Sequence, residues 1–177
     1  QSYRSMPWKN GKGETQEIAI DTQTPFRWRL SLAHLREASA FSLFPDYDRK
    51  LVFLGNAPVK MVSGDTTLSI SPLTVFSFEG EKPFQAETPT ECDDLGLLAL
   101  RQAVRGGLHV AHYQRSEEIQ FPLQGSEHFV YTIEGVVEFL ESTTGSKGVL
   151  RAGETLWISR HKPVNLLNLR TQAVSEG

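Results

Sequence analysis

The chain has 177 residues, of which 39% are hydrophobic and 22% are charged, and its formal net charge is −3. This composition is typical of a globular protein and argues against a disordered one. No block of Lys and Arg stands out, as nucleic-acid binding would require, and no apolar run is long enough to span a bilayer. Cys92 is the single cysteine, so no internal disulfide is possible. We expect a cytoplasmic protein that contacts neither nucleic acid nor a membrane.

Short segments with an alternating or wholly apolar pattern follow one another along the chain, each bounded by Gly, Pro, Asp or Ser. Such segments are typical of β-strands, and helical periodicity is almost absent. Many short strands at nearly regular spacing predict an all-β sandwich or barrel with little helix. The predicted strands include residues 17–20, 28–32, 50–54, 67–70, 75–78, 129–133, 136–140 and 155–158.

The classes of strand and turn repeat when the sequence is shifted over itself by about 80 residues. Phe41 then aligns with Phe121, and Gly55 with Gly135. Apolar alternation alone matches at any even offset, but aligned turn glycines make a chance match less plausible. We therefore predict two copies of one β-unit, joined by the proline-containing, acidic link that precedes Asp94. The predicted units span residues 1–90 and 91–177.

The second unit resembles a cupin, because the segments 128–135 and 150–158 have the strand–Gly turn and the Ala-Gly-Glu turn–strand patterns of that fold. The resemblance implies a bicupin, two cupin-like barrels or jelly rolls in one chain. Cupins usually hold a metal through three His and one Glu. Counting from the turn glycines places those positions at Ser42, Phe44, Asp48 and Phe84 in one unit, and at Pro122, Gln124, His128 and Val164 in the other. Since neither set supplies converging donors, we expect no metal and no cofactor.

Three stretches of the first unit are candidates for a binding site: residues 4–15, residues 28–31, and the turn at 44–49, whose Asp48 and Arg49 could instead pair with neighbouring side chains. In residues 8–13, Gly11 and Gly13 free the backbone to turn and expose N–H groups, and Lys9 and Asn10 add donors that could hold an anion. In the predicted strand at 28–32, Arg29 and Ser31 share one face. The alternative interpretations are a plain glycine turn and a solvated arginine face. Converging arginines would favour a small carboxylate, which the planar guanidinium binds through two parallel hydrogen bonds.

Three ordered motifs, residues 6–19, 26–33 and 41–51, together with a weaker fourth at 94–101, resemble the signature of the HutD/Ves family. The resemblance implies a bicupin fold, and a link to histidine utilisation for the HutD branch or to stress response for the Ves branch. It implies no established enzymatic activity. Lys12, Gly96 and Leu100 depart from the family pattern, which has Gly, Asn and Arg there. The polar signature positions are Lys9, Asn10, Thr15, Glu17, Arg29, Ser31, Asp48, Arg49, Asp94 and Arg101.

We predict a non-enzymatic protein that binds a small anion and moderates histidine utilisation by sensing or sequestering a metabolite such as urocanate, formylglutamate or formate. The alternatives are a metal-independent hydrolase, isomerase or lyase that uses Glu17, Asp48 or His34 as general acid or base, and a structural or protein-interaction module. Exposed edge strands make a homodimer plausible. The predicted ligand-binding residues are Trp8, Lys9, Asn10, Thr15, Glu17, Arg29, Ser31, Asp48, Arg49 and Arg101.

Overall fold

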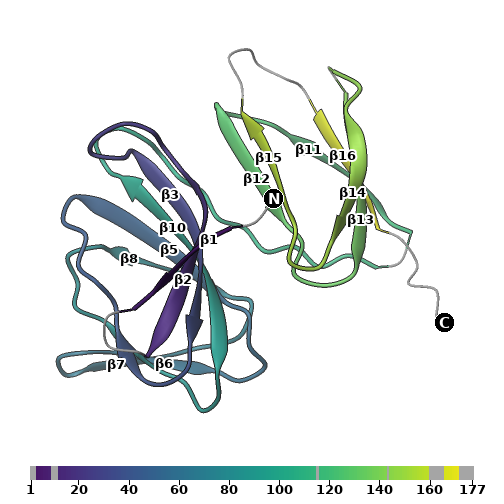
Figure 1. Ribbon diagram of the computed structural model, residues 1–177. Coiled ribbons are helices and arrows are strands. Elements are labelled where there is room, and N and C mark those ends of the chain that lie inside the picture. Colours follow the sequence, from purple (N-terminus) through teal and green to yellow (C-terminus); the bar gives the residue numbers. More distant parts are fainter. Residues whose placement is uncertain (1–2, 9–11, 115, 143, 160–165, 172–177) are drawn as a thin grey trace. The chain divides into compact units, whose positions relative to one another are not determined.

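The computed structural model describes residues 3–8, 12–114, 116–142, 144–159 and 166–171. All the regular secondary-structure elements among these residues are β-strands, which confirms the all-β prediction. They form two compact units, unit 1 (residues 1–110) and unit 2 (residues 111–177). Figure 1 shows unit 1 in purple to teal and unit 2 in green to yellow. None of the described residues belongs to a helix that could span a membrane.

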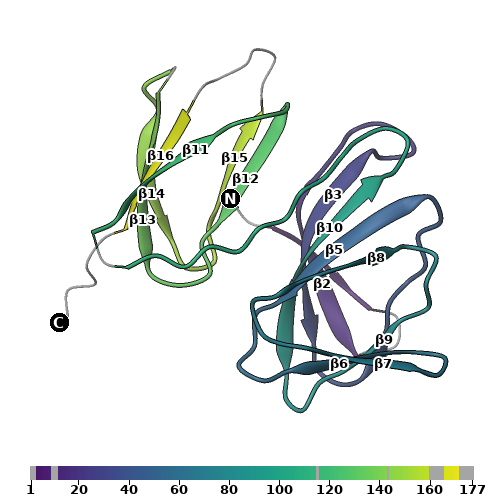
Figure 2. The ribbon, with the colours of Figure 1, turned by 180° about the vertical axis from the view of Figure 1, so that it is seen from behind.

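Unit 1 contains a six-stranded antiparallel sheet with the strand order β1-β2-β3-β10-β5-β8 and a four-stranded one with the order β4-β9-β6-β7. Figure 2 shows the larger sheet from behind, with β10 between β3 and β5. The strands are β1 (Arg4–Pro7), β2 (Gly13–Ile20), β3 (Trp28–Leu35), β4 (Ser39–Ala40), β5 (Tyr47–Phe53), β6 (Val59–Ser63), β7 (Thr66–Ile70), β8 (Val75–Glu79), β9 (Gln85–Glu87) and β10 (Cys92–Leu100).

Unit 2 contains a four-stranded sheet with the order β11-β16-β13-β14 and a two-stranded sheet of β12 and β15. Its strand pairings repeat those of unit 1, because β4-β9-β6-β7 corresponds to β11-β16-β13-β14, and the β5–β8 pair to the β12–β15 pair. The internal repeat is therefore present in the structure from β4 onward. The strands are β11 (Glu118–Pro122), β12 (Glu127–Tyr131), β13 (Val136–Glu141), β14 (Lys147–Arg151), β15 (Thr155–Ser159) and β16 (Leu166–Thr171).

The division between the units lies later in the chain than the predicted boundary at residue 90. β10 does not open the second unit; it pairs with β3 on one side and with β5 on the other, near the middle of the unit 1 sheet. The apolar pattern of Leu98 to Leu100 resembles that of Ile18 to Ile20 in β2. The shifted alignment therefore equated two strands of the same sheet.

The inner face of the six-stranded sheet is apolar at one end and polar at the other. Residues paired directly across an antiparallel sheet share a face, so the registers of β10 with β3 and with β5 give the composition of this face. At the apolar end, Leu35, Phe53 and Cys92 join a buried cluster with Met61 and Ala86 of the opposite sheet. At the polar end, the same face carries Ser31, Gly96 and Leu51, then Arg29, Leu98 and Arg49.

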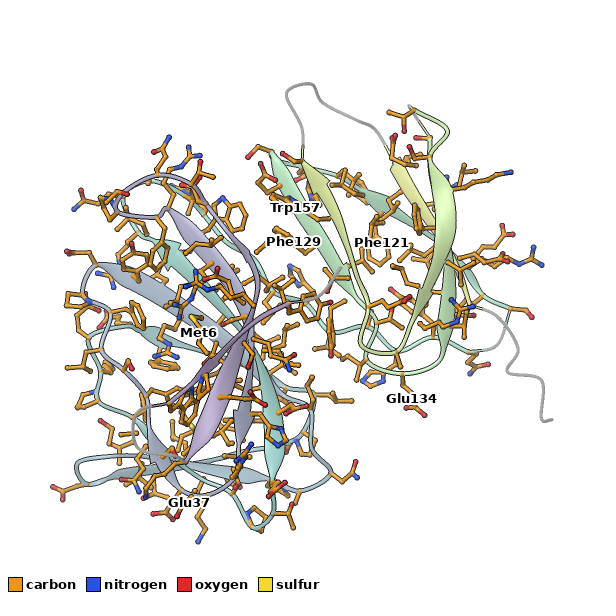
Figure 3. All side chains as sticks on the ribbon, in the orientation of Figure 1. Met6, Glu37, Phe121, Phe129, Glu134 and Trp157 are labelled. Carbon is orange, nitrogen blue, oxygen red and sulfur yellow. The ribbon has the colours of Figure 1, made fainter. Side chains whose placement is uncertain are left out.

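The core of unit 2 is smaller. Leu150, Leu167 and Leu169 are buried there, and Figure 3 shows Phe121 within the same unit. On the two-stranded sheet, the rings of Phe129 and Trp157 stack with their centroids 5.6 Å apart. The outward face of β12 and β15 is thus partly aromatic.

Gly80 follows β8 and fixes the turn that leads into β5. The amide of Phe44 donates to the Gly80 carbonyl at 2.8 Å, and the Gly80 amide donates to the Tyr47 carbonyl at 2.7 Å. A Cβ atom on Gly80 would lie 2.2 Å from the Phe44 oxygen and 2.9 Å from the Tyr47 oxygen. Only glycine allows this close approach of two backbone segments.

We predict that Gly80→Ala lowers the free energy of unfolding by about 1–3 kcal/mol, because the added methyl group must push two backbone carbonyls away. Denaturant-induced unfolding measures the change. Gly107→Ala is the matched control, since its nearest neighbour is the imidazole end of exposed His109 at 3.3 Å. Equal losses in the two variants would contradict the role given to Gly80.

Candidate functional site

Two arginines lie side by side on the inner face of the unit 1 sheet. Arg29 is on β3 and Arg49 on β5, and both pair in register with Leu98 of the intervening strand β10. Their side chains therefore point to the same face. The alternation in the sequence predicted this face for Arg29, but the position of Arg49 depends on pairing that the sequence does not display.

Aromatic rings surround both guanidinium groups. The Cζ atom of Arg29 lies 5.7 Å from the ring centroid of Phe26 and 5.2 Å from that of Phe44. The Cζ atom of Arg49 lies 4.7 Å from the centroid of Phe41, 5.2 Å from that of Phe78 and 5.7 Å from that of Phe44. Cation–π contacts partly offset the loss of hydration, and Phe44 contacts both arginines.

The arginines are poorly compensated by the other described residues. The pKa of Arg49 is lowered to about 10, chiefly by burial; the negative charge of Asp94 opposes this shift, and the positive charge of Arg29 adds to it. Burial also lowers the pKa of Arg29. Arg49 Nη1 donates to the Ser42 carbonyl at 2.9 Å, while Arg29 Nε is buried without a hydrogen-bond partner. This unused donor is a feature of a binding site rather than of a finished core.

Two carboxyl groups belong to the same polar region. Glu17 on β2 pairs in register with Ser31, and its negative charge raises the pKa of Arg29. Asp94 on β10 is only 3% exposed. Burial raises its pKa to about 7, although the charge of Arg49 acts in the opposite direction. Asp94 Oδ2 is buried without a hydrogen-bond partner among the described residues.

Gly96 lies beside Asp94 and Ser31. A Cβ atom there would lie 3.4 Å from Asp94 Oδ1, 3.9 Å from the Ser31 carbonyl and 4.0 Å from Ser31 Oγ. These are ordinary contact distances, so the glycine adds room between three polar atoms of the site. We define the arginine centre as Glu17, Arg29, Ser31, Arg49 and Asp94.

Trp8 and Thr15 lie near the arginine centre but serve the β1–β2 hairpin. Trp8 Nε1 donates to Thr15 Oγ1 at 2.8 Å, and the Trp8 ring packs against the buried core cluster of unit 1. The register places Thr15 opposite Met6, which is labelled within unit 1 in Figure 3. Lys9 and Asn10, also predicted to bind the ligand, lie outside the described residues.

Asp48 and Arg101 lie on the other face of the sheet and do not join the arginine centre. Asp48 follows Tyr47 on β5 and pairs in register with Ala99, so it points away from Arg49. Arg101 Nε donates to Asp48 Oδ1 at 2.9 Å, and its Nη2 donates to Glu81 Oε2 at 3.0 Å. Hydrogen bonds from Arg101 lower the pKa of Glu81 to about 2. Asp48 and Arg49 are neighbouring strand positions, so their side chains face opposite ways, and Arg101 lies just beyond the end of β10.

His34, a candidate general base of the enzymatic alternative, is also on the far face. Its Nδ1 atom contacts Asp93 Oδ1, and its Nε2 atom lies 3.7 Å from Glu91 Oε2. Of the candidate acids and bases, the structure brings only Glu17 into the arginine centre.

Sequence reasoning missed several residues of the site. Asp94 stood among the signature positions but not among the predicted ligand-binding residues. The rings of Phe26, Phe41 and Phe78 were not predicted to contact the arginines either. One signal was available, because Phe78 lies in the predicted strand at 75–78, but its pairing with Arg49 requires the register of β5 and β8.

No cluster of three or more His, Cys, Asp or Glu that could hold a metal ion occurs within the described part of the chain. Phe44, one of the positions at which cupin spacing places a metal ligand, contacts both guanidinium groups. A cavity of about 590 Å³ opens nearby, and Phe78 lines it while also contacting Arg49. Phe78 therefore stands between this cavity and the arginine centre.

Known proteins resemble the chain in both sequence and fold. An uncharacterised 21.2 kDa protein from the hutC 3' region of Pseudomonas putida is 40% identical over 85 residues, which cover 46% of this chain and 45% of that protein. Protein Ves from Cronobacter sakazakii is 32% identical over 115 residues, 61% of this chain and 64% of that protein. The matched part thus spans about half to two thirds of these curated relatives.

Among solved structures, a conserved protein of unknown function from Pseudomonas aeruginosa PAO1 has a TM-score of 0.85 at 26% identity, covering 96% of this chain and 89% of that one. A cupin 2 conserved barrel domain protein from Leptotrichia buccalis has a TM-score of 0.59 at 9% identity, covering 98% and 92%. The second likeness confirms the predicted cupin fold. The HutD family matches residues 1–175, so the chain belongs to the HutD family.

Proposed function

We propose that unit 1 binds a small carboxylate metabolite at the arginine centre, and that the protein senses or sequesters it without catalysis. Membership of the HutD family and the relative from the hutC 3' region link the chain to histidine utilisation. The ligand would then be an anionic intermediate of that pathway, with urocanate, formylglutamate and formate as candidates. Binding would moderate the pathway according to the metabolite concentration.

The observation that carries this proposal is the pair of buried guanidinium groups with an unused donor. The positive charge of Arg29 contributes to the lowered pKa of Arg49, and Arg29 Nε has no hydrogen-bond partner among the described residues. None of the ion pairs among the described residues includes either arginine. Burying two like charges this way is unfavourable unless an anion joins them.

The aromatic surroundings favour a flat ligand. The rings of Phe26, Phe41, Phe44 and Phe78 border the guanidinium groups. A carboxylate is planar and accepts two parallel hydrogen bonds from one guanidinium. The carboxylate group of the ligand would fit between the two arginines. The unsaturated or aliphatic part of the ligand would then lie against the phenylalanine rings.

We predict that Arg29→Met weakens carboxylate binding at least about thirtyfold, since removal of one buried charged partner costs ~2 kcal/mol or more. The measurement is a thermal-shift and calorimetry series with urocanate, formylglutamate and formate. For the wild-type protein, a ligand at about a hundred times its Kd should add ~2.7 kcal/mol to the free energy of unfolding. A flat wild-type series at millimolar ligand would refute the proposal.

The same substitution has an opposite effect on the unliganded protein. Arg29 Nε has no hydrogen-bond partner among the described residues, and Met fills a similar volume without a charge. Replacing a buried charge by an apolar side chain is often neutral or stabilising. We expect Arg29→Met to keep or raise the unliganded Tm while binding is lost. Arg36→Met, at an exposed position, is the control and should bind like the wild type.

One observation favours the enzymatic alternative enough to test it. A carboxyl group with a pKa of about 7, such as Asp94, is suited to general acid or base catalysis near neutral pH. Glu17 supplies a second carboxyl group beside Arg29.

We expect no turnover when each metabolite is incubated with the protein and followed by NMR. Conversion that persists in EDTA and disappears in a Glu17→Gln variant would favour the metal-independent enzyme instead. Glu79→Gln, an exposed position on β8, controls for the loss of a carboxylate.

A further inference from the structure

Asp94 is the most deeply buried acid of the arginine centre. It is 3% exposed, and its Oδ2 atom has no hydrogen-bond partner in the described part of the chain. Gly96 lies two residues along β10, and a Cβ atom there would be in ordinary van der Waals contact with Oδ1, at 3.4 Å. A buried carboxyl oxygen that is unpartnered in the free protein is a place for a ligand atom.

The charged groups that face Asp94 come from three neighbouring strands. Arg49 on β5 is the strongest opposite charge, Arg29 on β3 lies beside Arg49, and Glu17 on β2 acts on Arg29. On its own strand, Cys92 is a buried thiol, and Asp93 points to the other face, where it contacts His34. The opposite sheet contributes Met61 and Ala86, which carry no charge.

These groups do not hold Asp94 as a carboxylate. No ion pair among the described residues joins it to Arg49 or Arg29, and its Oδ2 atom accepts no hydrogen bond from them. A buried carboxylate without such partners is strongly disfavoured, whereas a neutral carboxylic acid is tolerated and keeps one O–H donor. The raised pKa of Asp94, about 7, agrees with this geometry.

We propose that Asp94 contacts the anion as a neutral carboxylic acid, so that its O–H group donates a hydrogen bond to the anion. Where Asp94 is ionised in the free protein, one proton therefore enters the site with the anion. This inference rests on the proposed function. The proton comes from solvent, the anion keeps its charge, and both leave together on dissociation. With Asp94 neutral, the charges of Arg29 and Arg49 exceed that of Glu17 by one, which a monoanion balances.

The direction of the pH dependence follows from this exchange. Below a pH of about 7, Asp94 already carries its proton in the free protein, and affinity should be constant. Above it, the free protein has lost the proton and must regain it on binding. Affinity should therefore fall by about tenfold for each further pH unit.

Calorimetry in buffers of different ionisation enthalpy counts the protons taken up on binding. Formate and formylglutamate are the probes, because their own charges do not change between about pH 5.5 and 8.5. We expect uptake close to one proton per anion at the higher pH and close to none at the lower. Asp94→Asn keeps an N–H donor at this position, and should bind with no proton uptake and no pH dependence.

Asp65→Asn is the control, because it makes the same chemical change in the exposed β6–β7 turn and should keep the wild-type profile. Binding by the wild type without proton uptake would overturn the role of Asp94 and leave the proposed function intact. Absence of binding at both pH values would overturn both. If Asp94→Asn does not fold, carboxyl ¹³C NMR of the wild type decides, since formate must raise the pKa of Asp94.

Discussion

The burial of two like charges on one sheet is the constraint around which unit 1 is organised. Arg29 and Arg49 lie on either side of Leu98 of the intervening strand β10, and aromatic rings border both. Rings offset part of the hydration that the guanidinium groups lose, but they supply no negative charge. Burial lowers the pKa of both arginines, and the remaining positive charge is what the proposed anion would balance.

The apolar end of the same inner face allows this arrangement to exist. Leu35, Phe53, Met61 and Ala86 are completely buried and belong to the apolar cluster that packs the two sheets of unit 1 together. Gly80 adds a close backbone contact that fixes the turn bearing Phe44. Stability and binding are thus separated along the strands, since one end supplies packing and the other carries unsatisfied donors. Such a division lets the polar end be unfavourable in the free protein without unfolding it.

Much of the fold could be predicted from the sequence, because period-2 alternation and turn glycines are local signals. The faces of Arg29 and Ser31 followed from the same alternation. The site as a whole could not, since it depends on which strands become neighbours. Asp48 was grouped with Arg49 because they are adjacent in sequence, yet they face opposite sides of β5 and Asp48 binds Arg101. The position of Asp94 near Arg49 likewise depends on the pairing of β10 with both β3 and β5, which the sequence does not show.

The place of β10 in the sheet has a consequence for how the protein is made. It is the last strand of unit 1 to leave the ribosome, yet it fills the gap between two strands made much earlier. Until residue 100 has emerged, β3 and β5 each have an unpaired edge, and nothing holds Arg29 near Arg49. The nascent chain is therefore exposed to mispairing for most of the synthesis of unit 1. The arginine centre is complete only when this one strand lies between β3 and β5.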